Sequence, residues 1–132
     1  SRLDSILQLM GTQKKEVERT APLERVTIKN HGRIYFVETS SIDWIEADGN
    51  YVTLHSGSTK HLLRIKMNQL EERLDSKIFF RIHRSTIVNV QSIKELRPYF
   101  NGAYSILLKG DEKIYSSRGY RGRVEHIMNH LS

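Results

Sequence analysis

Short runs of β-branched and aromatic residues recur about every eight to twelve residues along most of this chain, and this spacing restricts its fold more than any other feature. Turn-forming segments such as Asp48-Gly49-Asn50 and Asn101-Gly102 separate the runs. Beyond residue 22, helical spacing of apolar residues replaces this pattern only between 67 and 74 and between 124 and 131. The sequence therefore predicts a mainly β domain with short helices, one of them at the C-terminal end.

The first 22 residues have a different spacing of apolar residues from the rest of the chain. Apolar residues there fall at helical spacing: Leu3, Ile6, Leu7 and Met10. A highly charged stretch follows, and Pro22 ends the segment. We therefore expect a linker or connector helix over residues 1–22 and one domain over residues 23–132.

Composition excludes several classes of function. The 132 residues include no cysteine, which removes disulfides, thiolate catalysis and the usual zinc sites. His126 and His130 stand four apart, but no glutamate follows His126 to make a zinc-protease motif, so a solvated helix face is the interpretation. There is no secretory signal pattern and no apolar run long enough to span a membrane. We expect a cytoplasmic protein with no metal or other cofactor and no membrane partner.

Charge is unevenly distributed around a formal net charge of +6. Five basic residues and one acidic residue lie between Lys77 and Asn101, and four basic residues without an acidic one lie between Lys113 and Arg123. The acidic residues gather instead between Glu38 and Gly49. This segregation predicts a basic face for a polyanion, and nucleic acid is the partner it favours.

The stretch from Phe79 to Val90 combines two aromatics, a basic and polar centre, and a β-branched end. Ile87, Val88 and Val90 indicate a strand. The basic and polar side chains then lie on or beside the loop that feeds it: Arg81, His83, Arg84 and Ser85. Such a loop presents donors to phosphates and base edges, while the alternative is that its arginines are merely solvated.

Several blocks together closely resemble the LytTR family of bacterial DNA-binding domains. They are Trp44–Val52 (WIEADGNYV), Leu70–Leu74 (LEERL), Phe80–Asn89 (FRIHRSTIVN), Ile93, and Ser117-Arg118. The resemblance extends from about residue 24 to about residue 127, which is nearly the whole chain after the expected linker.

The resemblance implies an elongated assembly of small antiparallel sheets that places loops, rather than a recognition helix, in successive major grooves. It implies the effector domain of a bacterial transcription regulator, usually a two-component response regulator. We therefore expect sequence-specific binding of double-stranded DNA at direct repeats by two copies of the domain. A receiver or sensor domain is expected N-terminal to it in the full-length protein.

The family's base-contacting positions lie in three loops. By the resemblance, the first loop supplies Asn50 with Tyr51 beside it, and the second supplies Arg84, next to Ser85. An arginine at the second position can bond O6 and N7 of one guanine. The third position aligns with Gly119, which has no side chain, so Arg118 and Arg121 are the candidates there.

Neighbouring residues have expected roles of their own. Ser117 is a candidate N-cap of the last helix, so Arg118 and Arg121 would lie in its first turn and converge there on a phosphate. His83 either contacts DNA or braces the Arg84 loop. Replacing Lys94 or Lys113 is expected to change the salt dependence of binding little if they lie off the binding face. Large aromatic residues are expected to pack in the core or against the sheets: Trp44, Phe79, Phe80, Tyr99 and Phe100.

Three other classes of function compete with this interpretation. An OB-like module for single-stranded nucleic acid is also basic and all-β. A hydrolase using His83 and Ser85 would need motifs that the sequence lacks, such as a Gly-x-Ser-x-Gly elbow, so no enzymatic activity is expected. A protein-interaction domain would expose a large apolar patch rather than a basic stripe.

Overall fold

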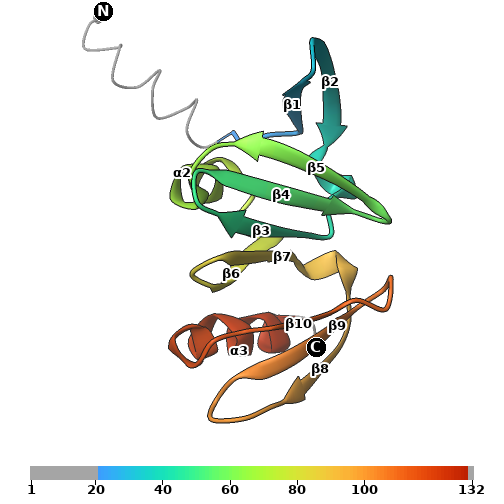
Figure 1. The fold of residues 1–132 in the computed structure, drawn as a ribbon. Helices are drawn as coiled ribbons and strands as arrows, with labels where there is room; N and C mark the ends of the chain where they lie inside the picture. Colours follow the sequence, from blue (N-terminus) through green and yellow to red (C-terminus); the bar gives the residue numbers. More distant parts are fainter. Residues whose placement is uncertain (1–20, 131–132) are drawn as a thin grey trace, which may run out of the picture.

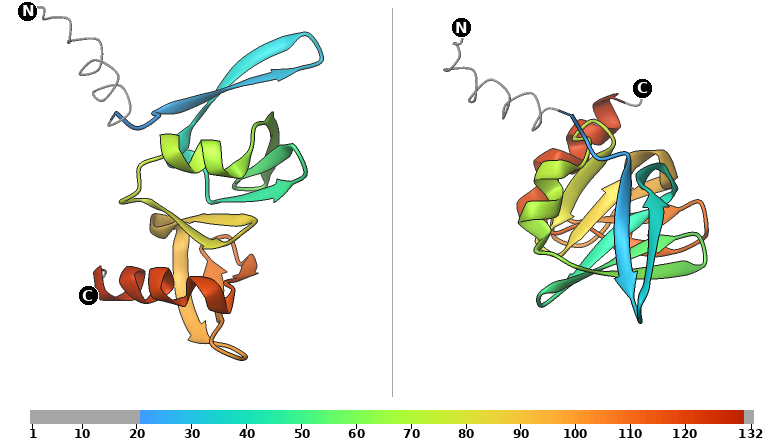
Figure 2. Two further views of the ribbon diagram at one scale, coloured as in Figure 1. Left: turned by 90° about the vertical axis from the view of Figure 1, so that its left-hand side faces the viewer. Right: turned by 90° about the horizontal axis from the view of Figure 1, so that it is seen from above.

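Three antiparallel sheets follow one another along the long axis of the molecule (Figures 1 and 2). The computed structural model describes residues 21–130. The expected linker helix therefore lies almost wholly outside the described residues. The elongated mainly β architecture that the sequence predicts is confirmed.

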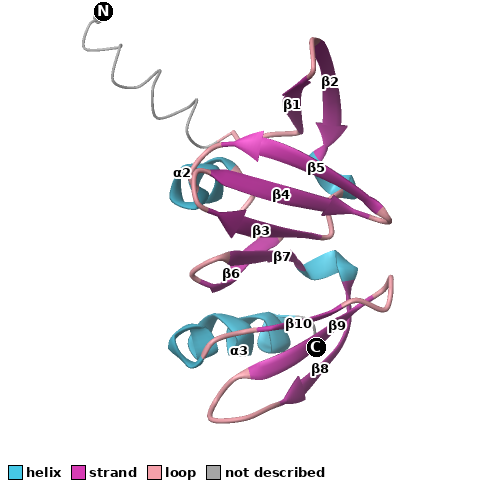
Figure 3. Ribbon diagram, in the orientation of Figure 1, coloured by secondary structure: helices cyan, strands magenta, loops and turns pink. Residues whose placement is uncertain are grey.

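The strands divide into a two-stranded, a five-stranded and a three-stranded sheet (Figure 3). The hairpin consists of β1 (Arg25–Asn30) and β2 (Arg33–Glu38). The central sheet has the order β5-β4-β3-β7-β6, with bounds Thr59–Arg64, Tyr51–Ser56, Trp44–Asp48, Thr86–Asn89 and Phe79–His83. The last sheet has the order β10-β9-β8, with bounds Lys113–Tyr115, Tyr104–Leu108 and Ile93–Pro98. Because the described strands form open sheets and no closed barrel, the alternative of an OB-like module is wrong for this chain.

Within residues 21–130, two α-helices and three short 3₁₀ turns accompany the sheets. Helix α2 (Met67–Arg73) is the short helix that the apolar spacing predicts, and α3 (Arg121–His130) is the expected C-terminal helix. The 3₁₀ turns are η1 (Thr39–Ser41), η2 (Val90–Ser92) and η3 (Arg118–Tyr120). In the described part of the chain, no helix has the length and apolar character that crossing a membrane requires.

Two hydrophobic cores meet at strands β6 and β7. The first core joins the hairpin, the central sheet and α2, and Ile87 belongs to it. The second core joins the last sheet and α3, and the neighbouring residues Ile82 and Val88 belong to it. Alternate residues of a strand point to opposite faces, so β6 and β7 are buried on both sides. This explains the unbroken apolar run at 87–88 and makes the β6–β7 hairpin the most firmly supported part of the fold.

Asn89 fixes the chain where the central sheet gives way to the last one. Its buried amide Nδ2 donates to the carbonyl oxygen of Ile42 at 2.9 Å, and its Oδ1 accepts from the N–H of Gln91 at 2.8 Å. The asparagine that ends the family-like block therefore has a structural role.

Replacing Asn89 with alanine is expected to destabilise the domain by about 2 kcal/mol, because a buried carbonyl loses its donor and η2 loses its cap. Urea unfolding of the two proteins measures this difference. Unchanged stability would show that the Asn89 amide contributes nothing to the joint between the sheets.

One part of the expected core is wrong. Phe79 is buried, and Phe80 and Trp44 are half-buried against the second core. Phe100, however, stands on the turn between β8 and β9 with 77% of its surface exposed, whereas Tyr99, 60% exposed, packs its ring against Tyr115 of β10. Phe100 directly precedes the two central residues of this turn, Asn101 and Gly102.

Candidate nucleic-acid interface

The β6–β7 turn carries Arg84 at its tip. His83 pairs with Thr86 across the turn, which leaves Arg84 and Ser85 as its two central residues. Arg84 is exposed, and its side chain has no hydrogen bond or ion pair within residues 21–130. The turn therefore offers a free guanidinium group at the end of a doubly buried hairpin.

Arg81 braces this turn from beneath. Its Nε donates to the carbonyl oxygens of His83 and Arg84 at 3.1 and 3.2 Å, and its Nη2 also donates to Arg84. The expectation that Arg81 presents its donors from the loop is therefore wrong, because the side chain is buried. Strand alternation is the signal that could have shown this, since Arg81 shares a strand face with the core residue Phe79.

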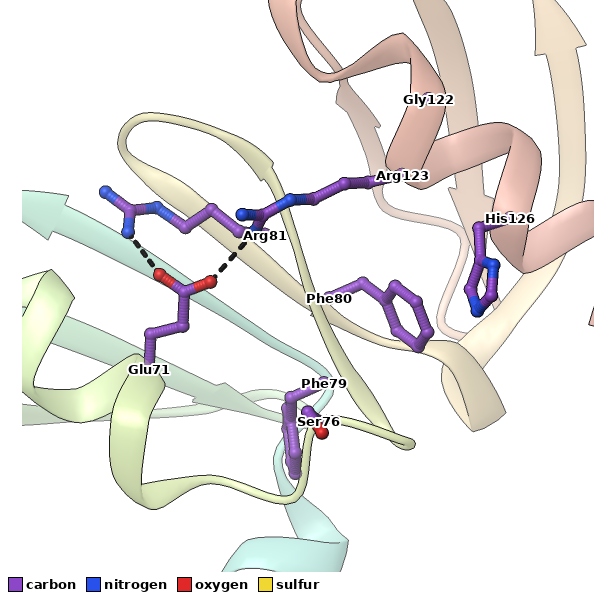
Figure 4. A pocket seen from close by; sticks show the side chains of 8 residues that line it. All are labelled: Glu71, Ser76, Phe79, Phe80, Arg81, Gly122, Arg123 and His126. Carbon is purple, nitrogen blue, oxygen red and sulfur yellow. Dashed lines mark hydrogen bonds and ion pairs between the residues drawn. The ribbon is translucent and has the colours of Figure 1, made fainter.

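The acidic partner of Arg81 comes from helix α2 (Figure 4). Glu71 accepts from Arg81 Nη1 at 2.7 Å through Oε1 and from Arg123 Nη1 at 2.9 Å through Oε2. Asn68 Oδ1 also accepts from Arg81 Nη1, at 2.9 Å. The carboxylate thus links α2, the β6–β7 turn and α3 beside a depression of about 370 Å³.

His83 contacts the turn from within. Its Nδ1 accepts the backbone N–H of Ser85 at 3.1 Å and lies 2.9 Å from Ser85 Oγ. Because Nδ1 accepts, the neutral ring carries its proton on Nε2. Of the two roles left open for His83, this geometry supports bracing, and it also engages the Ser85 hydroxyl inside the turn.

The β3–β4 turn lies next to the Arg84 turn. Asp48 pairs with Tyr51, so Gly49 and Asn50 form the turn, and Gly49 adopts a φ of +65° that favours glycine. Asn50 and Tyr51 are both exposed. The N–H of Ala47 donates to the carbonyl oxygen of Ser85 at 2.9 Å, which ties the two turns together.

The third candidate loop is the 3₁₀ turn η3, and it is tied to the second. The N–H of Ser117 donates to the carbonyl oxygen of Ile82 at 2.9 Å. Ser117 precedes η3 without a side-chain capping bond, and α3 begins only at Arg121. The expected N-cap role of Ser117 for the last helix is therefore wrong, and Arg118 lies before the helix rather than in its first turn.

Arg118 and Arg121 differ in their surroundings. Arg118 is exposed, and its guanidinium group has no ion pair within residues 21–130. Arg121 bonds Glu125 one helical turn later at 2.9 Å. The hydrogen bond and charge of Glu125 raise the pKa of Arg121 above its ordinary value, so this guanidinium stays charged but is shared with a carboxylate. Arg118 is thus the freer of the two groups.

An open depression of about 480 Å³ separates the Arg84 turn from the end of β10. His83 and Ser85 line one side of it, and Lys113 and Ser117 line the other. Lys113 also lines a second depression, together with Glu95 and Arg97, so whether it lies on or off the binding face stays a prediction. Lys94 is paired with Asp111 at 3.7 Å, in the β9–β10 turn.

The three candidate loops lie at the same end of their strands. Figure 1 shows the β3–β4 turn, the β6–β7 turn and the start of α3 on its left-hand side, whereas the β4–β5 and β9–β10 turns lie on the right. Among the described residues no group of three histidine, aspartate or glutamate side chains forms a metal site. The left-hand side instead presents uncompensated cations and an amide, the groups that contact phosphates and base edges.

The family model described as the LytTr DNA-binding domain matches residues 32–129, which is most of the chain. The chain belongs to the LytTR family. It is 30% identical over 109 residues to the sensory transduction protein LytT of Oceanobacillus iheyensis, a match that covers 81% of this chain and 43% of that protein. The transcriptional regulatory protein LytR of Staphylococcus aureus is 31% identical over 88 residues, covering 67% of this chain and 36% of LytR.

A solved structure supports the fold of this LytTR domain. The LytTr DNA-binding domain of a Bacillus cereus response regulator superposes with a TM-score of 0.73 at 23% identity, covering 80% of this chain and 97% of that one. The chain spans less than half the length of the LytT and LytR relatives. The family model describes a DNA-binding domain.

Proposed function

We propose that this LytTR domain binds specific double-stranded DNA by inserting its three candidate loops into the major groove. Asn50 and Tyr51 act from the β3–β4 turn, Arg84 from the β6–β7 turn, and Arg118 with Arg121 from the start of α3. Ser85 shapes the second turn. Arg84 reads a guanine through two parallel hydrogen bonds, and Arg121 contacts phosphate.

One observation carries this proposal: the free guanidinium of Arg84 projects from a turn whose backbone is held by hydrogen bonds. Arg81 donates to the carbonyl oxygens of His83 and Arg84, and His83 accepts the N–H of Ser85. A side chain on a preorganised turn loses less conformational entropy when it binds. Backbone hydrogen bonds from Ala47 and Ser117 connect this turn to the other two loops. The three loops can therefore meet a duplex as one unit.

The names of the relatives extend the proposal to the whole protein. They are a sensory transduction protein and a transcriptional regulatory protein, each longer than the matched region. We therefore propose that residues 23–132 are the effector domain of a cytoplasmic response regulator, with residues 1–22 connecting it to an N-terminal receiver or sensor domain. Two copies would occupy direct repeats on DNA.

Selection of binding sites from random duplex DNA by the full chain tests this function. We expect enrichment of one short sequence, and of paired copies of it in direct orientation. Competition with scrambled duplex and with single strands of the selected sequence is expected to be weak. Equal competition by all three nucleic acids would contradict specific duplex binding and favour a non-specific single-strand or duplex binder.

Affinity for the selected duplex is expected to fall steeply with salt. If the loops neutralise roughly five phosphates, log Kd plotted against log salt concentration has a slope of about 4 to 5. Lys113→Ala should reduce this slope by about 0.9, because Lys113 lines the depression beside the site, whereas Lys94→Ala should leave it unchanged. Fluorescence anisotropy over a salt series measures all three slopes. A wild-type slope below about 2 would show that the basic loops do not contact the DNA backbone.

A further inference from the structure

The turn between β8 and β9 exposes an aromatic ridge beside the third candidate loop. Phe100 is the most exposed large apolar side chain among the described residues, and Tyr99 and Tyr115 are also exposed, by 60% and 44%. The rings of Tyr99 and Tyr115 pack with their centroids 4.8 Å apart. The tyrosines therefore support each other, while Phe100 projects beyond them.

The backbone of this turn is rigid. Tyr99 N–H donates to Ala103 at 2.9 Å, and Ala103 N–H donates to Phe100 at 3.1 Å. Asn101 and Gly102 have φ values of 60° and 86°, the positive angles that a type I′ hairpin turn requires at both central positions. Phe100 is thus held in solvent by a preformed turn, where its exposed ring forgoes the free energy of burial.

Arg118 joins this ridge to the proposed DNA-binding face. A Cβ atom built on Gly102 would lie 3.1 Å from Arg118 Cγ, so the aliphatic part of Arg118 passes directly over the turn. The depression beside the Arg84 turn also reaches Tyr115 and Lys113. Figure 1 shows the β8–β9 turn at the lower left, at the same end of the strands as the other three loops.

We infer that the β8–β9 turn is a fourth DNA-contacting element, in which Phe100 makes an apolar contact with the duplex next to the Arg118 contact. This inference rests on the proposed function and extends it. DNA is the occupant that the surroundings favour, because the basic side chain of Arg118 passes over the turn and Lys113 lines the same depression as Tyr115. The apolar partners that a groove offers are thymine methyl groups and deoxyribose rings.

The test compares Phe100→Ala with Phe36→Ala in the full chain, using the duplex selected by the wild type. Phe36 is a matched control, because it is an exposed phenylalanine (55%) on the β1–β2 hairpin, away from the four loops. We expect Phe100→Ala to weaken binding about tenfold, Phe100→Leu to retain most of the affinity, and Phe36→Ala to have no effect. Thermal unfolding should be unchanged for all three variants.

The salt dependence separates an apolar contact from a charge contact. Phe100→Ala should leave the salt slope unchanged, whereas Arg118→Ala should lower it by about 0.9. A duplex with deoxyuridine in place of thymidine identifies the apolar group that Phe100 contacts. If the wild-type chain loses as much affinity for this duplex as Phe100→Ala loses for the original one, the contact is a thymine methyl group. If the wild-type chain loses no affinity, the contact is deoxyribose. Both results support the contact.

Two results would overturn the inference while leaving the proposed function in place. One is wild-type affinity of Phe100→Ala for the selected duplex. The other is normal binding of Phe100→Ala to a single site, together with a loss of the self-association that the wild-type chain shows in sedimentation. The ridge would then be a contact between two copies of the chain. A wild-type chain that selects no sequence would instead remove the proposed function itself.

Discussion

Replacing Arg84 with alanine is expected to weaken binding to the selected duplex by about 1–3 kcal/mol and to relax the preference at one base pair in each repeat. The exposed guanidinium projects from a turn whose backbone groups are already bonded by Arg81 and His83. The two hydrogen bonds that we propose it makes to a base would therefore be lost without a compensating rearrangement. Because no described residue bonds the Arg84 side chain, the free energy of unfolding should change little. Anisotropy with selected and scrambled duplexes measures the loss of discrimination.

Two further variants separate base reading from attraction by charge. Arg84→Lys keeps the charge but loses the planar fork that bonds O6 and N7 together, so it should restore general affinity and leave discrimination low. Arg33→Ala removes one positive charge from the β1–β2 turn, outside the candidate site, and should not alter discrimination. If Arg84→Ala weakens selected and scrambled DNA by the same factor, Arg84 contacts the backbone, and base reading belongs to Asn50 or Arg118.

Arg121→Ala is expected to act differently from Arg84→Ala. The guanidinium is bonded to Glu125, so a phosphate must share it or displace the carboxylate. The loss of affinity should be small and equal for selected and scrambled duplexes, as a phosphate contact requires. A loss of discrimination in this variant would instead give Arg121 a base contact. The same anisotropy measurements decide between these outcomes.

The fold was predictable from sequence because its elements carry strong local signals. Asn101-Gly102 sets a hairpin turn by its backbone preferences alone, and Met67, Leu70 and Leu74 mark the buried face of α2. The division of these strands into three separate sheets depends on which strands pair over long distances. The family resemblance predicted an elongated assembly of small antiparallel sheets, which the structure confirms, but not the number of sheets or the strands in each.

The site was less predictable, because its residues are distinguished by their partners. Arg81 and Arg84 are the same residue type three positions apart, yet one is buried beneath the turn and the other is free. Strand alternation places Arg81 on the face of the core residue Phe79, but no local pattern identifies its partner Glu71, ten positions away on another element. Phe100 was expected in the core because of its apolar ring, although it directly precedes the Asn101-Gly102 turn and is exposed there.

Replacing Glu71 with alanine is expected to destabilise the domain by about 2–3 kcal/mol, because it leaves the buried guanidinium of Arg81 without its carboxylate. This loss of stability is small for the breaking of a buried ion pair, because Glu71 itself is one-third exposed and Asn68 remains bonded to Arg81. Arg81 is then free to turn toward water, which removes donors from the carbonyl oxygens of His83 and Arg84. Urea unfolding measures the stability, and the ratio of affinities for selected and scrambled duplex measures the state of the turn.

Glu72→Ala is the matched control for this variant. Glu72 is exposed on the same helix, and its removal changes the net charge by the same amount, so it should raise affinity for all duplexes slightly without a loss of stability. Arg123→Ala removes only the exposed half of the Glu71 pairing and should cost less than about 1 kcal/mol. If Glu71→Ala is destabilised but discriminates DNA as well as Glu72→Ala does, the carboxylate supports the fold alone. If Glu71→Ala loses both stability and discrimination between selected and scrambled duplexes, α2 holds the Arg84 turn in place through Arg81.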